Sequence, residues 1–315
     1  MGNLAQIPGP VHRIGRPFLT VPTRHAMSDS NPKGSRPKQS VKFRKARIRH
    51  FLFTTGLNRA SRGWLYRRHH AQSVLSRELT IHVPAWPAAF DGIRIGHISD
   101  LHVGDLMTPA RAMEVVGQLA AMEPDMICHT GDLVDLHWRG VEPVAKAIAD
   151  INTPCGNFFV IGNHDELESG EDVERMVREA GSTVLRNDVA EIRRGDDTLR
   201  VGGIGWARTP ARARQLIDAT IGDECVDLLL AHNPKAFDHA AEKKIPLTLS
   251  GHTHGGQIAR RNRPNANLAV AHRRSAGLYE HERSRLFVTV GAGAWFPIRW
   301  NVPAEVALLT IRSTP

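Results

Sequence analysis

The stretch of residues 93–102 reads IRIGHISDLH, an alternating apolar run that ends in two polar side chains, Asp100 and His102. Alternation of this kind is typical of a β-strand, and Asp and His are common ligands of divalent metals. Four more strand-like runs end in the same way, at residues 126–130, 157–161, 226–231 and 246–250. We therefore expect reactive side chains in loops at the carboxyl ends of strands.

Segments with helical spacing separate the strands, at residues 108–122, 140–151, 169–180 and 209–219. Thr108, Ser169 and Thr209 stand where N-cap residues are expected, and Gly181 follows the third helix. Further strands are expected at residues 79–83, 199–204, 286–290 and 305–311. This alternation of strands and helices predicts an α/β fold. Residues 260–285, rich in Arg, Asn and His, are expected to form a surface excursion.

Charge is distributed unevenly along the 315 residues. Residues 1–77 hold 16 Lys/Arg and a single acidic residue, Asp29, a net charge of +15. The remainder holds 25 basic and 31 acidic residues, a net charge of −6. We therefore divide the chain into a basic N-terminal arm, residues 1–77, and a mildly acidic domain, residues 78–315. The asymmetry favours an anionic surface as the partner of the arm over a nucleic-acid-binding core.

The arm itself divides into two parts. Residues 1–40 are rich in Pro, Gly, Ser and Arg and are expected to be disordered, and Met27 is an alternative start to Met1. Residues 41–77 interleave aromatic and aliphatic side chains with Arg and Lys. This pattern suits either a segment in a membrane interface or a helix packed on the body with a solvated cationic face. Gly56 and Gly63 are expected to interrupt any long helix.

Cysteine usage and targeting patterns bear on the compartment. Cys128, Cys155 and Cys225 are widely spaced and form no CxxC pair, which argues against a disulfide framework and agrees with a reducing compartment. No run approaches the ~20 apolar residues needed to cross a bilayer. The start lacks a signal-peptide pattern, and Gln6 stands where a myristoylation motif has Ser or Thr. We expect a cytoplasmic protein, with the inner face of the membrane as the surface for the arm.

Five short motifs follow the strands in order, namely Asp-x-His at 100–102, Gly-Asp at 131–132, Gly-Asn-His-Asp at 162–165, His at 232 and Gly-His-x-His at 251–254. In this order they resemble the calcineurin-like metallophosphoesterase superfamily, from about residue 93 to the C-terminus. Two longer motifs, at residues 251–257 and 297–305, resemble a bacterial membrane-associated phosphodiesterase branch. The resemblance implies a sandwich of two mixed β-sheets flanked by helices, with a metal site at the carboxyl ends of the strands.

The resemblance also implies the ligands of two divalent metal ions. Three residues are assigned to the first ion, three to the second and one to both, namely Asp100, His102 and His254, then Asn163, His232 and His252, and finally Asp132. Imidazole and oxygen donors suit Mn, Fe or Zn alike, so the sequence leaves the metals open. A hydroxide bridging two such ions can attack a phosphoryl group in line.

Two residues of the third motif are candidates for proton transfer. His164 is the expected general acid, because it neighbours the ligand Asn163 and would protonate the departing alkoxide. Asp165 is expected to orient the His164 ring, with capping of the following turn as a compatible second role. Arg299 is expected either to contact the phosphate or head group of the substrate or to pair with Glu305.

The remaining polar residues carry simpler expectations. Asp135 and His137 are expected in a solvated loop, with the lining of the substrate cleft as the alternative. His97 and His129 are expected within strands, packed or hydrogen-bonded. The other histidines are expected to be exposed, namely His69, His70, His239, His272 and His281.

We expect a metal-dependent hydrolase of phosphodiester or pyrophosphate bonds. The basic, aromatic arm favours a membrane-lipid-related substrate over a soluble cyclic nucleotide. A nuclease is the alternative enzyme, since the arm could hold DNA phosphates, but no recognition domain is apparent and nucleic acid is not the expected partner. A noncatalytic scaffold would have lost ligands or the acid, and none is missing. No specific protein partner is expected.

Overall fold

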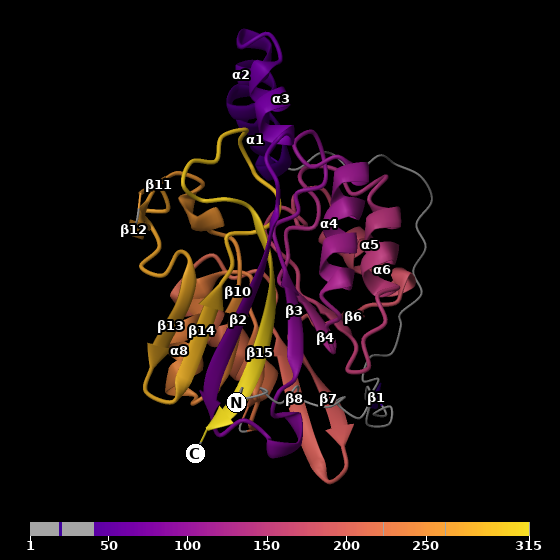
Figure 1. Cartoon of the computed structure of the whole chain (residues 1–315), viewed down its shortest axis with the longest axis vertical. Helices are drawn as coiled ribbons and strands as arrows, with labels where there is room; N and C mark the ends of the chain where they lie inside the picture. The colour runs from indigo at the N-terminus through magenta and orange to yellow at the C-terminus, as the bar shows by residue number, and fades with distance from the viewer. Residues whose placement is uncertain (1–18, 21–40, 223, 262, 315) are drawn as a thin grey trace, which may run out of the picture.

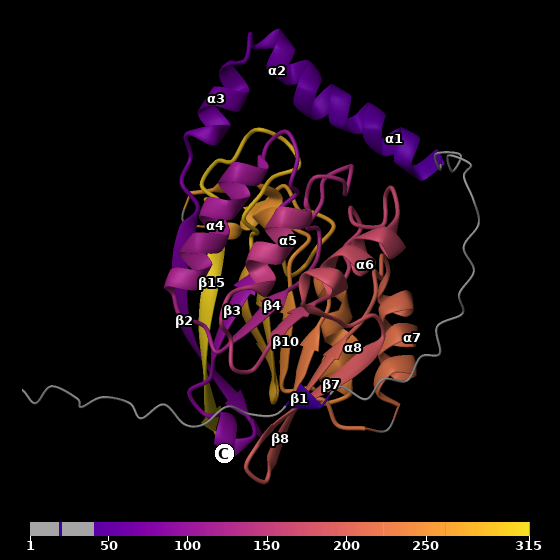
Figure 2. The ribbon, with the colours of Figure 1, turned by 90° about the vertical axis from the view of Figure 1, so that its right-hand side faces the viewer.

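The computed structural model describes residues 19–20, 41–222, 224–261 and 263–314. Two mixed β-sheets face each other, and helices cover their outer faces (Figure 1, Figure 2). The predicted α/β sandwich of two mixed sheets is confirmed.

The first sheet carries the loops of the first three motifs. Its six strands lie in the spatial order β2 (Leu75–Pro84), β15 (Glu305–Thr314), β3 (Arg94–Ile98), β4 (Met126–His129), β5 (Asn157–Phe159) and β6 (Thr183–Val184). Strands β3 to β6 are parallel, whereas β15 is antiparallel to β3 and parallel to β2. Because β3, β4 and β5 run side by side in one direction, the motifs that follow them meet at one edge of the sheet.

The second sheet carries the last two motifs. Its seven strands lie in the order β1 (Leu19–Thr20), β7 (Asp188–Arg194), β8 (Asp197–Gly203), β9 (Leu228–Leu230), β10 (Leu247–Ser250), β14 (Ser284–Val288) and β13 (Gly277–His281). Strands β8, β9, β10 and β14 are parallel, so the residues after β9 and β10 also share an edge. A separate two-stranded ribbon pairs β11 (Ala259–Arg260) with β12 (Arg263–Asn267).

A buried apolar layer holds the two sheets together. Ile95 and Phe158 of the first sheet share one cluster with Leu230, Leu249 and Phe287 of the second, and all five are at most 1% exposed. Burial of each such side chain contributes roughly 1.5–3 kcal/mol. The sandwich therefore provides a rigid support for the loops at its edge.

Helices cover both outer faces of the sandwich. They are α4 (Pro109–Ala121), α5 (Glu142–Ala149) and α6 (Gly170–Ala180) on the first sheet, and α7 (Pro210–Ile221) and α8 (Phe237–Glu242) on the second. Short 3-10 turns lie at Ala88–Phe90, Pro234–Ala236 and His254–Gly256. The hydroxyls of Thr108, Ser169 and Thr209 each accept a bond from a first-turn amide, which confirms the predicted caps.

The described part of the arm is helical and lies over one end of the sandwich. Helix α1 (Val41–His50), a π-helical turn (Phe51–Thr55) and α2 (Gly56–Ala60) form one rod, and α3 (Trp64–His70) follows (Figure 2). Only one predicted interruption is found: Gly63, with φ +80°, turns the chain, whereas Gly56 stays helical with φ −64°. No helix among the described residues is long and apolar enough to span a bilayer.

Two parts of the prediction from sequence differ from the structure, and a third lies outside the described residues. Strand β2 begins at Leu75 and pairs there with Glu305, so the predicted boundary at residue 77 falls inside a strand. Strand β7 was not anticipated. Strand β13 lies within the predicted surface excursion, because the sequence of β13 is too polar to suggest pairing. The predicted disorder of residues 1–40 lies outside the described residues, apart from Leu19–Thr20.

Candidate metal centre

The five motifs converge where their strands end. Three groups of donor atoms form there, each with its atoms within 4.8 Å of one another: Asp100, His102 and His254, then His102, Asp132 and His164, and then Asp132, His232 and His252. Asp100 and Asp132 are at most 2% exposed. Buried carboxylates are stable only when paired, hydrogen-bonded or bound to a cation. The sequence order therefore brings the predicted ligands together in space.

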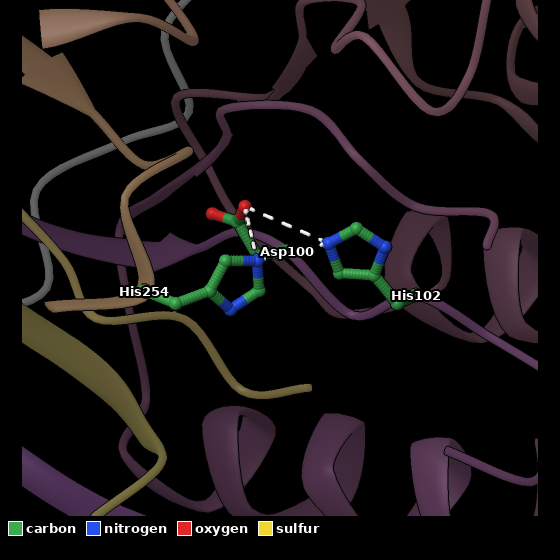
Figure 3. Close-up of side chains that lie close together, drawn as sticks. All are labelled: Asp100, His102 and His254. Atoms are coloured by element: carbon green, nitrogen blue, oxygen red, sulfur yellow. Dashed lines mark hydrogen bonds and ion pairs between the residues drawn. The ribbon is translucent and has the colours of Figure 1, made fainter. Parts of the chain in front are cut away.

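The first group has the spacing of donors around one ion (Figure 3). The Nε2 atoms of His102 and His254 lie 3.0 Å apart, and Oδ1 of Asp100 lies 3.2 Å from Nε2 of His254 and 3.8 Å from Nε2 of His102. Atoms held about 2.0–2.2 Å from one tetrahedral ion lie roughly 3.3–3.6 Å from one another. Imidazole nitrogens and a carboxylate oxygen at these distances fit a transition-metal ion.

Asp132 lies between this group and the third one. Its Oδ2 is 3.5 Å from Nε2 of His102 and 3.2 Å from Nε2 of His232. Oδ1 of Asn163 is buried and has no hydrogen-bond partner among the described residues, as expected of an amide oxygen that serves as a ligand. The donor set thus fits two cations that share the Asp132 carboxylate.

The protonation states of two buried histidines, His252 and His254, suit metal binding. Burial lowers the pKa of His252 to about 3 and holds that of His254 well below its usual range, so both rings are neutral. Neutral imidazole is the form that donates a lone pair to a metal. Burial alone would raise the pKa of Asp132, but the neighbouring His232 and His164 keep it far below its ordinary value.

Left-handed backbone at the ligands is a feature that sequence spacing did not indicate. Asp100, His102, Asp132, His252 and His254 all have φ between +48° and +70°. Side chains other than glycine rarely adopt this conformation, which costs about 1–3 kcal/mol each and persists only when neighbouring contacts enforce it. Backbone bonds between the loops provide such contacts, for example from the Asp100 amide to the Gly131 carbonyl at 2.9 Å and from the His102 amide to the Asp132 carbonyl at 3.0 Å.

Two glycines permit this close approach of the loops. A Cβ atom on Gly131 would lie 2.6 Å from the amide nitrogen of Gly162, and one on Gly162 would overlap Oδ1 of Asp132. The second and third motifs therefore need glycine where their backbones meet.

The match to known proteins agrees with this centre. Residues 93–256, just over half of the chain, match the family model described as calcineurin-like phosphoesterase. The chain belongs to the calcineurin-like phosphoesterase family. As a member of it, the protein is a metal-dependent hydrolase of phosphoric esters.

Three relatives illustrate the extent of the likeness. The metallophosphoesterase YkuE of Bacillus subtilis is 29% identical over 273 residues, which cover 81% of this chain and 92% of that protein. A metallophosphoesterase of Helicobacter pylori is 30% identical, over 70% of this chain and 60% of its own length. A Danio rerio protein described as a transmembrane protein with metallophosphoesterase domain is 28% identical, over 75% of this chain and 56% of its own length.

In this phosphoesterase the His164 ring is held by Asp135, which was predicted to lie in a solvated loop; the contacts involve Nδ1 of His164. Its Nδ1 lies 2.8 Å from the Asp135 carbonyl oxygen and 3.3 Å from the Asp135 carboxylate. Burial lowers the pKa of His164, but the carboxylates of Asp132 and Asp135 outweigh it and raise the pKa. The contacts of Nδ1 with Asp135 therefore favour the protonated form that a general acid needs.

The predicted contact between Asp165 and the His164 ring is wrong. The Asp165 carboxylate accepts bonds from the amides of Asp132 and Gly162, both at 2.8 Å, and of Val134 at 3.1 Å. Asp165 therefore joins the second and third motifs as a structural crosslink. Burial, reinforced by the Asp132 charge, raises its pKa to about 6, although these amide bonds act against the shift.

Arg299 also differs from both predicted roles. Its guanidinium is buried and donates to the carbonyls of Gly293 at 2.6 Å and Val290 at 2.8 Å. Glu305 pairs instead with Arg77, at 3.2 Å. The remaining contacts of Arg299 are backbone carbonyls and Nδ1 of His254, which lies 3.3 Å from Nη2. These contacts indicate a residue that fixes the loop after β14 and the His254 ring, not a phosphate contact.

Several residues at the site were missed or misplaced by sequence reasoning. The Trp206 ring lies 4.8 Å from that of His252, and the His272 ring lies 5.2 Å from it. Trp206 follows strand β8, as the ligands follow their strands, and that position was an available signal. His272 belongs to the polar excursion, where nothing marked it. Two histidines predicted to be exposed are buried, namely His69 and His239.

Proposed function

We propose that this phosphoesterase hydrolyses a phosphodiester or pyrophosphate bond in a membrane-lipid-related substrate, using two divalent cations. The two donor groups on either side of Asp132 are the observation that carries this proposal. We assign Asp100, His102 and His254 to the first ion, Asn163, His232 and His252 to the second, and Asp132 to both. When bound, such a pair neutralises charge on the phosphoryl group and supplies an acidified water as nucleophile.

The protein's own residues handle the leaving group. His164 donates a proton from Nε2 to the departing alkoxide, while the Asp135 carbonyl and carboxylate keep Nδ1 protonated and fix the ring. The neutral amide of Asn163 limits negative charge at the second ion, which leaves the site attractive to an anionic phosphate.

The outer face of the arm supports a membrane-proximal substrate. Val41, Ile48 and Leu52 are 68%, 62% and 56% exposed, and they lie on the side of the rod opposite the buried Phe43 and Ala46, given about 3.6 residues per turn. One face of the rod thus contacts the catalytic domain, and the other presents aliphatic side chains to solvent.

Charge on the arm indicates which surface it would meet. Residues 41–72 hold nine Lys/Arg and no Asp or Glu. Phe51, Phe53 and Trp64 are also about half exposed. Exposed aromatic and aliphatic side chains among cations suit the headgroup region of an anionic bilayer, at the inner face of the membrane. The Danio rerio relative is described as a transmembrane protein, which is compatible with this proposal.

The catalytic proposal is tested by metal content and turnover in full-length protein. Wild type should bind two transition-metal ions per chain and hydrolyse phosphodiesters, whereas Asp132→Asn should lose most turnover and bound metal while remaining folded. Asp150→Asn, an exposed change far from the site, is the matched control. Wild-type turnover in Asp132→Asn would reject the proposal.

The membrane part is tested by vesicle sedimentation. Wild type should sediment with vesicles of phosphatidylglycerol and phosphatidylcholine more than with phosphatidylcholine alone. Changing Ile48, Leu52 and Trp64 together to Ser should abolish the difference, with wild-type turnover on a soluble diester as the check on folding. Equal sedimentation of the two proteins would remove the support.

The nuclease alternative is tested by comparing turnover of several phosphodiester substrates. Faster turnover of single-stranded DNA than of lipid-headgroup or small aryl diesters would favour a nuclease over our proposal. Faster turnover of cyclic nucleotides than of those diesters would favour a cyclic-nucleotide phosphodiesterase.

A further inference from the structure

The first helix of the arm, α1, lies over one end of the sandwich (Figure 2). Its residues line a pocket together with Asp135 and His164. Phe43 and Ala46 pack with Leu167, which follows the third motif. The Thr54 hydroxyl donates to the Trp295 carbonyl oxygen at 3.2 Å. The arm lies outside the residues matched to the family, and it contacts the loops that surround His164, the proposed general acid.

His50, at the end of α1, lies between two carboxylates of the catalytic domain. Its Nδ1 is 3.0 Å from Oδ2 of Asp135, and its Nε2 is 3.1 Å from Oδ2 of Asp105. A ring that donates from both nitrogens is an imidazolium. Partial burial lowers the pKa of His50, but hydrogen bonds to Asp105 and Asp135 outweigh it and raise the pKa to about 9.

Asp135 connects this ring to the acid. One oxygen, Oδ2, faces His50, and the other, Oδ1, lies 3.3 Å from Nδ1 of His164. The carboxylate is largely buried, and the charge of the two rings favours its ionised form and lowers its pKa despite the opposing effect of burial. Oδ1 also lies 3.8 Å from Nδ1 of His102. With both oxygens occupied, the carboxylate has one preferred orientation toward His164 and His102.

The same groups line a small pocket. Ala46, Arg49 and His50 of the arm line it opposite Asp135, His164 and Trp295. A leaving group protonated by His164 departs next to this pocket, so the arm shapes the surroundings of the reacting oxygen.

We propose that His50 is a positioning residue for the hydrolysis: by holding Asp135 it fixes the His164 ring, so that the arm completes the proton-donating part of the site. This inference rests on the proposed function of His164. It predicts that loss of His50 impairs leaving groups that need protonation more than those that depart as stable anions.

The test compares two soluble aryl phosphodiesters in full-length, metal-loaded enzyme. One releases 4-nitrophenolate, a stable anion, and the other releases phenol, which needs a proton. His50→Ala should lower kcat for the phenyl diester about tenfold, a fraction of the 10²–10⁴ that general acids contribute, and kcat for the nitrophenyl diester less than about twofold. KM and metal content should stay unchanged.

Two further variants separate positioning from general damage to the arm. His50→Gln keeps a donor toward Asp135 and should recover part of the lost kcat for the phenyl diester. His70→Ala is the matched control, because His70 belongs to the same arm and its Nε2 lies 3.3 Å from a backbone carbonyl oxygen in the same loop, that of Asp105. It should leave both rates unchanged.

A double-mutant cycle tests the route through Asp135. In an Asp135→Asn background, His50→Ala should cause no further loss on the phenyl diester, because the connecting carboxylate is already gone. Fully additive losses would contradict the proposal.

The remaining outcomes separate this inference from the proposed function. Equal losses on both diesters, no loss on either, or a fall in bound metal in His50→Ala would overturn the role of His50 alone, provided that Asp132→Asn is inactive. Turnover by Asp132→Asn would remove the proposed function instead.

Discussion

The loops that carry the proposed metal ligands and the arm that lies over them differ in how they reach the same site. The ligand loops place Asp100, Asp132 and His254 with left-handed backbone, held by bonds between loops. The arm reaches His164 with a regular helix, through the side chain of His50 and one intervening carboxylate. Short contiguous motifs set the loop geometry, whereas single residues far apart in sequence set the arm geometry. A site can therefore be recognisable in its loops while part of its support leaves no motif.

Among changes in the loops of the metal centre, Gly162→Ala is expected to have the largest effect on metal binding and kcat. The added Cβ would overlap the Asp132 carboxylate, so we expect loss of most bound metal and a fall in kcat of more than about 100-fold, as misplacement by an ångström can cause. Metal analysis and steady-state kinetics measure this.

Gly117→Ala is the control for this change. Gly117 lies on α4 with nothing within 4 Å of an added Cβ, and the change should stabilise the helix by about 0.5–1 kcal/mol. Retention of both ions by Gly162→Ala would show that the loops tolerate more than their close approach suggests.

His164→Ala is expected to have the next largest effect. Removing the acid should lower kcat about 100-fold for the phenyl diester and far less for the nitrophenyl one, with both ions retained. A rate loss that ignores the leaving group would mean that His164 supports the metal centre, as its grouping with His102 and Asp132 allows.

Asp165→Ala sharpens the distinction between a structural and a positioning carboxylate. Three buried amides would lose their acceptor, so the free energy of unfolding should fall by about 2–4 kcal/mol in a denaturant titration. Asp135→Asn should change kcat more than it changes stability. The opposite pattern would return the orienting role to Asp165.

The smallest expected effect is a pH dependence of arm docking. The pKa of His50 is raised from 6.5 to about 9 by docking, so its contribution is fully present below pH 6.5 and is lost as the pH rises toward 9. The rate of trypsin cleavage in α1 is measured for wild type and for His50→Gln at each pH. The ratio of the wild-type rate to the His50→Gln rate should rise from well below one toward one as the pH rises. A ratio that stays constant between pH 6.5 and 9.5 would rule out the ion pairs as a source of docking.

The fold and the convergence of the candidate ligands could be predicted because their signals are local. Apolar runs that end in Asp100, Asp132 or His232 combine a strand with its chemical group in a few residues. Parallel pairing of the strands then places such groups at one edge without further information. The helix caps at Thr108 and Ser169 are equally local.

The exchanged roles of Asp135 and Asp165 show where local information ends. Asp165 directly follows His164, yet its carboxylate is directed at amides of the second motif, while Asp135, from the loop after β4, faces the ring. Their orientation depends on how two loops meet, which spacing does not encode. His239 was expected to be exposed, but it is buried between Asp218 and Glu242, a pairing that appears only once α7 and α8 pack together.

The connection between the arm and the body has a mechanical consequence. Strand β2 continues from the arm and pairs in parallel with β15 from Leu75↔Glu305 to Pro84↔Thr314. Tension applied to the arm would load these two strands along their length, so that the whole ladder of bonds resists together and does not peel apart one bond at a time. The few side-chain contacts that dock α1 would yield first, and the arm could be drawn off the site while the sandwich stays intact.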